Sequence, residues 1–224
     1  MKKKVFIAMA VAAAMAAMPV AAGAAGSSHD SSSSTSMTTS NSTSNAGVAS
    51  GATVVSSQPT VQVTESGTKV TVAGATKDAT GTTVGLVGES AGNGAVKSDD
   101  VTVSVATGVA ETAGLSDETV NTIKALNNTS VSLSSTLPGL GLDGFAKVGG
   151  TRAIIAKDAA GNDATATVTL YVDSLPAGAT TVNVVVFSNV TSQWTVIRNL
   201  QVDMASKTVT FTVNGSCTAQ IAAK

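Results

Sequence analysis

The sequence predicts a mainly β fold: an antiparallel β-sandwich-like region with one short inserted helix and a C-terminal β-meander. After Pro59, Val and Thr alternate with a period of two, which suits strands that are buried on one face. Clusters of Gly, Asn, Asp and Ser separate these runs, as turns do between short strands. Only the stretch at residues 116–127 carries apolar residues at helical spacing.

Residues 1–24 are expected to be a secretory signal peptide. Three lysines at residues 2–4 precede an unbroken apolar run over residues 5–18, and residues 22–24 are small enough for cleavage. The apolar run is shorter than the roughly 20 residues that a membrane-spanning helix needs. We therefore expect a secreted or cell-surface-associated protein, with no membrane insertion after the signal peptide is cleaved.

Residues 25–59 are expected to form a disordered Ser/Thr-rich linker. Nearly every residue from 27 to 44 is Ser or Thr, so the segment has too little apolar surface to offset the entropy cost of ordering. His29, the only histidine of the chain, lies here beside Asp30. We interpret it as a solvated linker residue, in preference to a metal ligand or a catalytic base.

The composition excludes several classes of function. The formal net charge is -1, and loss of the three signal-peptide lysines leaves 10 basic against 14 acidic residues. The chain therefore lacks the positive surface that nucleic-acid binding requires. One Cys and one His exclude an intramolecular disulfide framework, a Cys-based zinc site and a histidine metal cluster. We predict no nucleic-acid partner, no metal and no cofactor.

Residues 60–173 are expected to form the β-sandwich-like domain. Its predicted strands include the Val- and Thr-rich runs 61–64, 68–72, 84–87 and 101–105, and a further short strand that begins with Val131 and Leu133. Ser116 is a favourable N-cap for the helix at 116–127, which either covers an edge or end of the sheet or docks a partner. The leucines of residues 137–144 are expected to tuck into the core from a folded loop.

The clearest hairpin is expected at residues 152–172, around the turn-forming sequence from Asp158 to Asp163. Residues 174–224 are expected to form the C-terminal β-meander, packed on the preceding domain or continuous with it. Its four strands are predicted at residues 182–187, 193–197, 208–213 and 217–221.

Two stretches resemble known bacterial families. Residues 156–169, with Asp158, Gly161 and Asn162 before an alternating Thr/Val strand, resemble the last hairpin of bacterial immunoglobulin-like modules. Residues 189–213 are similar to the C-terminal β-meander of uncharacterised secreted surface proteins of Gram-positive bacteria. This resemblance implies an immunoglobulin-like, surface-associated β-protein without known catalysis. The inserted helix and Cys217, which stands where the second family typically has Gly, depart from it.

No catalytic residue is predicted, because the folded region contains no histidine. Its candidate carboxylates are expected in solvated turns and strand ends, and are Glu65, Glu89, Asp99, Asp100 and Glu111. Asp158, Asn162 and Asp163 cluster in one turn but lack the spacing of a calcium loop. We interpret both groups as structural, and the protein as not an enzyme.

Two aromatic residues, Trp194 and Tyr171, are the candidate ligand contacts, because aromatic faces supply the apolar part of sugar recognition. For Trp194 a core position is the preferred interpretation. Cys217 begins an alternating strand, so we interpret it as a core thiol, with an intermolecular disulfide as the alternative.

The favoured hypothesis is a non-enzymatic surface or extracellular protein with a structural or adhesive role, whose partners are surface proteins or glycans. A carbohydrate-binding or other ligand-binding module is the alternative. A hydrolase with an unfamiliar site is the third.

Overall fold

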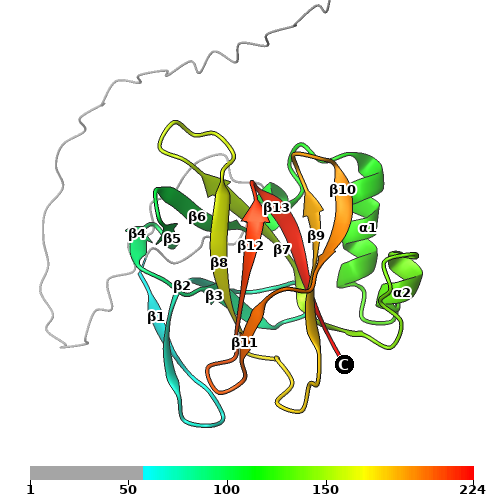
Figure 1. Cartoon of the computed structure of the whole chain (residues 1–224), viewed down its shortest axis with the longest axis horizontal. Helices are drawn as coiled ribbons and strands as arrows, with labels where there is room; N and C mark the ends of the chain where they lie inside the picture. The colour runs from blue at the N-terminus through cyan, green and yellow to red at the C-terminus, as the bar shows by residue number, and fades with distance from the viewer. Residues whose placement is uncertain (1–57) are drawn as a thin grey trace, which may run out of the picture. The chain divides into compact units, whose positions relative to one another are not determined.

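The computed structural model describes residues 58–224 (Figure 1). The expected signal peptide, His29, Asp30 and all but the last two residues of the expected linker lie outside the described residues. None of the helices in the described part combines the length and apolarity needed to span a bilayer.

Two antiparallel sheets make up the described region, which confirms the predicted β-sandwich-like class. The six-stranded sheet has the order β1 (Thr60–Val63), β2 (Lys69–Lys77), β3 (Thr83–Leu86), β8 (Thr165–Val172), β12 (Thr208–Asn214) and β11 (Gln201–Asp203). The seven-stranded sheet has the order β10 (Gln193–Ile197), β9 (Val182–Ser188), β13 (Cys217–Ala223), β7 (Ala146–Lys157), β6 (Val101–Ala106), β5 (Ala95–Ser98) and β4 (Ser90–Gly92).

The main core lies between the two sheets. Leu86 and Phe211 from the six-stranded sheet meet Val103, Ile154 and Val184 from the seven-stranded sheet, and all five are almost fully buried. Strand β12 behaves as its alternating sequence predicts, with every second side chain directed into this core. Its other side chains, on the outer face, are three threonines and Asn214.

Those threonines pair with threonines of β8. Thr210 lies opposite Thr169, with their hydroxyl oxygens 2.8 Å apart, and Thr212 lies opposite the exposed Thr167. The outer face of the six-stranded sheet is therefore polar here, as expected for strands with one solvent-exposed face.

The β1–β2 hairpin extends the six-stranded sheet beyond β3. A Cβ on Gly85 would lie 2.4 Å from Cγ1 of Val72, so only glycine allows β2 to approach β3 this closely. Val72, Val70 and Tyr171 form a small buried cluster. At the hairpin tip, the hydroxyl of Thr64 donates to the carbonyl of Ala205 at 2.9 Å.

The chain between β6 and β7 forms a helical insert, which contains η1 (Gly108–Glu111), α1 (Asp117–Asn127) and α2 (Leu133–Thr136). The predicted helix is confirmed: Ser116 is its N-cap, and its hydroxyl accepts a hydrogen bond from the Thr119 backbone N–H at 3.3 Å. The predicted strand at Val131 and Leu133 is wrong. Ser132 caps α2 there instead by accepting from the Ser135 backbone N–H.

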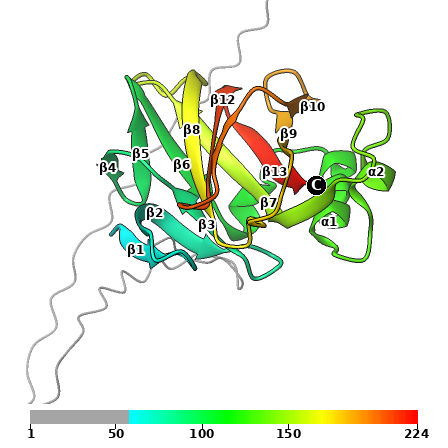
Figure 2. The same cartoon turned by 60° about the horizontal axis from the view of Figure 1, so that its bottom comes forward.

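The insert lies beside β7, β13 and β9 of the seven-stranded sheet (Figure 2). It makes a second core on the outer face of this part of the sheet. Leu126, Leu133, Leu137 and Leu142 pack with Val185 of β9 and Ala222 of β13. As expected, Leu137 and Leu142 are buried, and Leu140 is partly buried. The helix covers a sheet face, whereas the sequence predicted an edge or end.

The predicted hairpin at residues 152–172 is wrong in its pairing. The turn forms, because Asp158 accepts from the backbone N–H groups of Ala160 and Asn162, at 2.9 and 2.8 Å. However, β7 and β8 belong to different sheets, and only an isolated bridge joins Lys157 to Asp163. The chain therefore crosses between sheets at this turn.

The C-terminal strands likewise do not form one continuous meander. β9 and β10 pair as a hairpin, whereas β12 and β13 lie in different sheets although only Gly215 and Ser216 separate them. β13 lies between β9 and β7, and β12 lies beside β8. Residues 174–224 thus complete both sheets.

Candidate functional site

A groove of about 640 Å³ lies where the start of α1 faces the β9–β10 hairpin, and we call it the Trp194 groove. Its walls come from the start of α1, the end of α2 and the hairpin. Its main side chains are Ser116, Glu118, Thr122, Asn189, Ser192 and Trp194.

Trp194 is partly buried in this groove. It lies opposite Phe187 across the β9–β10 hairpin, with ring centroids 5.3 Å apart and an interplanar angle of 55°. The indole also packs against the second core. The residue therefore contributes to packing and lines the groove at the same time.

The polar part of the groove is mainly uncharged. Ser116, Thr119 and Thr122 line one side, and Asn189 and Ser192 line the other. The hydroxyls of Ser116 and Thr119 lie 3.0 Å apart, and the hydroxyl of Thr122 donates to the carbonyl of Glu118. These groups donate and accept hydrogen bonds without carrying charge. Together with an aromatic face, they form a site suited to a ligand rich in hydroxyl groups.

Glu118 is the charged residue of this lining, and its side chain is exposed in the first turn of α1. Glycoside cleavage generally uses two carboxyl groups on either side of the bond. No second carboxylate lines the groove among the described residues. The groove as built therefore favours binding.

Of these groove residues, the sequence predicted only Trp194 as a ligand contact, and the polar residues around it, among them Asn189 and Ser192, were missed. Asn189 and Ser192 lie in the segment that separates β9 from β10, which the sequence identified only as a break between strands. Nothing in the local sequence indicates that this turn faces the start of α1, because the two segments are distant in the sequence and only the tertiary fold brings them together.

Tyr171, the second candidate contact, lies in the other sheet and is only 3% exposed. It packs under β2 with Val70 and Val72. Burial, with a smaller contribution from Asp173, raises the pKa of its phenol. The structure does not bring Tyr171 and Trp194 together, and the ring of Tyr171 offers no open platform.

Among the candidate carboxylates, Glu111 differs from expectation because its side chain is largely buried, with 20% exposed. Its Oε1 lies 3.0 Å from Nη1 of Arg152, whose side chain is only 4% exposed. Burial raises the pKa of Glu111, and the nearby guanidinium offsets part of that rise. The other four candidates are exposed as expected, and Glu65 and Glu89 pair with lysines.

The Asp158–Asp163 turn uses its oxygens for local hydrogen bonds. Asp163 accepts from the backbone N–H and the hydroxyl of Ser216 and pairs with Lys157 at 3.2 Å. The hydrogen bonds from Ser216, followed by Lys157, lower the pKa of Asp163. No metal-binding group of three or more acidic, His or Cys residues occurs within the described range.

Cys217 is 4% exposed and packs in the main core. Burial raises the pKa of its thiol to about 12, so the reactive thiolate is disfavoured. This position agrees with the core interpretation, since a disulfide to another molecule needs an accessible sulfur.

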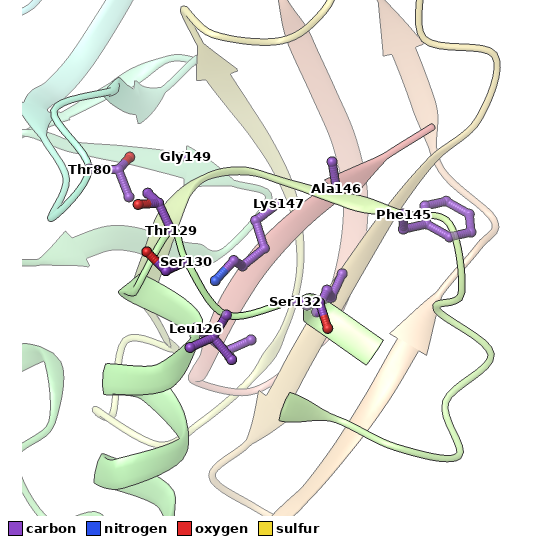
Figure 3. A pocket seen from close by; sticks show the side chains of 11 residues that line it. Thr80, Leu126, Thr129, Ser130, Ser132, Phe145, Ala146, Lys147 and Gly149 are labelled. Atoms are coloured by element: carbon purple, nitrogen blue, oxygen red, sulfur yellow. The ribbon is translucent and has the colours of Figure 1, made fainter. Parts of the chain in front are cut away.

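A second pocket of about 420 Å³ surrounds Lys147 of β7, between α1 and α2 (Figure 3). The Lys147 ammonium donates to the carbonyls of Ala125 and Asn128 at the end of α1. Partial burial lowers its pKa. The positive charge of Lys147 thus stabilises the C-terminal, partly negative end of α1, which is a structural role.

No family model, curated protein or solved structure matches this chain. The residue roles given above therefore rest on geometry and chemistry.

Proposed function

We propose that this chain is a secreted, non-enzymatic protein of the cell surface or extracellular matrix, with a structural or adhesive role. Its contact surface for glycans or surface proteins is the Trp194 groove. The observation that carries the proposal is a partly exposed indole beside uncharged hydroxyl and amide groups.

An adhesive role fits the available chemistry better than catalysis. Residues 58–224 contain no histidine, the most common general base of enzymes. Glu118 faces the groove without a second lining carboxylate among the described residues. The signal-peptide features of residues 1–24 support an extracellular setting.

Carbohydrate binding is the more specific candidate, and Trp194 favours it. A sugar ring presents C–H groups that pack on an aromatic face, while its hydroxyls exchange hydrogen bonds with Ser, Thr and Asn side chains. The groove offers both kinds of group within one hollow.

Trp194 is the only tryptophan of the chain, so its fluorescence reports on this groove alone. We expect soluble neutral glycans, drawn from glucose, mannose and N-acetylglucosamine oligomers, to change its emission. Pull-down with the secreted protein on host and bacterial surface material extends the test to protein partners.

Calorimetric titration of variants locates the contact. Trp194→Phe keeps an aromatic ring beside Phe187, and we expect at least about tenfold weaker binding, which corresponds to about 1.4 kcal/mol. Thr212→Ala, on the outer face of the other sheet, is the matched control and leaves binding unchanged. Equal binding by both variants, or no binding of any glycan by the wild type, contradicts the glycan proposal.

A further inference from the structure

A further hollow of about 300 Å³ lies over β6, β7 and β13, beside the segment that contains η1. We call it the η1 hollow. Its polar lining includes Glu111, Lys157, Asp163, Asn189 and Ser216.

The η1 hollow and the Trp194 groove adjoin. Ala113, Leu115 and Asn189 line both, so these three residues form a boundary that the two spaces share. From this junction, the Trp194 groove extends toward Glu118, and the η1 hollow extends toward Lys157. Each has a volume in the range of small-molecule sites, about 300–1,000 Å³.

The charges in the η1 hollow already have partners. Lys157 lies 3.2 Å from Asp163, and Glu111 lies 3.0 Å from Arg152. Because each charge faces an opposite one, a polyanionic or polycationic ligand gains little attraction here. The η1 hollow thus favours an uncharged ligand rich in hydroxyl groups, and the Trp194 groove offers mainly uncharged polar side chains to the same ligand, with Glu118 as the charged residue of its lining.

The segment beside the hollow is held to the sheets by a buried cation. Arg152 pairs with Glu111 of η1 and donates to the backbone carbonyl of Thr76 at 3.2 Å. This arrangement fixes η1 against β7, so the hollow is part of the folded scaffold and does not have to be formed by the ligand.

We propose that the ligand is an uncharged oligosaccharide of several sugar residues that occupies the Trp194 groove and the η1 hollow together. This inference rests on the proposed glycan-binding function. It adds that recognition depends on chain length and that Ala113 lies at the point where the ligand passes between the two spaces.

Ala113 provides a direct test because its small side chain is exposed and lies outside both cores. Ala113→Phe narrows the junction, whereas Ala113→Ser is the matched small control. The probes are neutral saccharides of one to six sugar units, built from the sugar that binds the wild type best. Trp194 emission reports binding, and an unchanged unfolding midpoint shows that each variant is folded.

We expect the affinity of the wild type to be about tenfold or more higher, about 1.4 kcal/mol, for the hexasaccharide than for the disaccharide. In Ala113→Phe this gain in affinity with chain length disappears, while the disaccharide still binds. Ala113→Ser keeps the gain in affinity. An affinity independent of chain length, or a gain that Ala113→Phe retains, overturns this inference and leaves the proposed function standing. If no oligomer of any length binds the wild type, the proposed glycan contact fails as well.

Discussion

The outer faces of the two sheets differ in what covers them. On the six-stranded sheet, β8 and β12 present Thr167 and Thr212 to solvent. On the seven-stranded sheet, every residue of β13 and nearly every residue of β9 is buried, because the helical insert packs on them. The segment between β6 and β7 therefore gives one sheet a second core, with hollows at its margin, that the other sheet lacks.

The sequences of the strands match this difference. β12 alternates Thr with Val or Phe, as a strand with one wet face does. β9 reads Val-Asn-Val-Val-Val-Phe-Ser, a nearly continuous apolar run, which is typical of strands covered on both sides. The margin of the covered face, where α1 meets the β9–β10 hairpin, is where the Trp194 groove forms.

The largest effect is expected from Leu126→Ala, which removes a fully buried side chain from the second core. Loss of burial and the resulting cavity should lower the free energy of unfolding by about 2–5 kcal/mol. Thr212→Ala on the open face should change it by no more than about 0.5 kcal/mol. Urea unfolding of both variants measures the difference, and equal effects would show that the insert does not form a true core.

A smaller effect is expected on the open-faced sheet from Gly85→Ala. The added Cβ would collide with Val72 and with the backbone of β2, so we expect a loss of about 1–3 kcal/mol. Gly178→Ala is the matched control, since nothing lies within 4 Å of its Cβ position. It should be neutral or stabilise by up to about 1 kcal/mol. Thermal unfolding compares them, and similar midpoints would argue against the close approach of β2.

Glu111 at the margin of the covered face gives a pH-dependent effect. Because burial raises its pKa in the folded state, its contribution to stability is fully present below the unfolded value and is lost as pH rises through the folded value. The stability of the wild type relative to Glu111→Gln should therefore increase as pH falls toward about 4.5. Urea unfolding of both proteins across acidic and neutral pH checks this, and the opposite slope would refute it.

The smallest effect is expected from Lys97→Ala, which removes an exposed ion pair. Lys97 and Glu89 lie 3.0 Å apart, but their side chains are 53% and 74% exposed. Solvent screens such a pair, so the free energy of unfolding should change by about 0–1 kcal/mol. A loss comparable with that of Leu126→Ala would mean that this edge of the sheet depends on electrostatics far more than its exposure indicates.

The alternation of apolar and polar residues is sufficient to predict most strands and the β-sandwich-like class. In strands such as β12, every second residue is apolar, and these are the residues that the fold buries. Sheet membership was not predictable in the same way. The Asp158–Asp163 turn chemistry reverses the chain but does not decide whether the next strand pairs with β7 or joins the other sheet.

Short apolar segments were also ambiguous. Val131 and Leu133 look like the start of a strand, yet Ser132 caps a single helical turn, and Leu133 is buried in the second core. For the candidate site, Trp194 stood out as the only tryptophan. Its neighbours could not be predicted, and neither could the Glu111–Arg152 pair, which joins residues 41 positions apart.

Hydrogen–deuterium exchange of the protein, with and without its best-binding glycan, most directly tests whether the covered face carries the contact surface. We predict slower exchange at residues 113–122 and 189–194, with no change along the threonines of β8 and β12. Protection of the threonine face, or of neither face, would contradict the account.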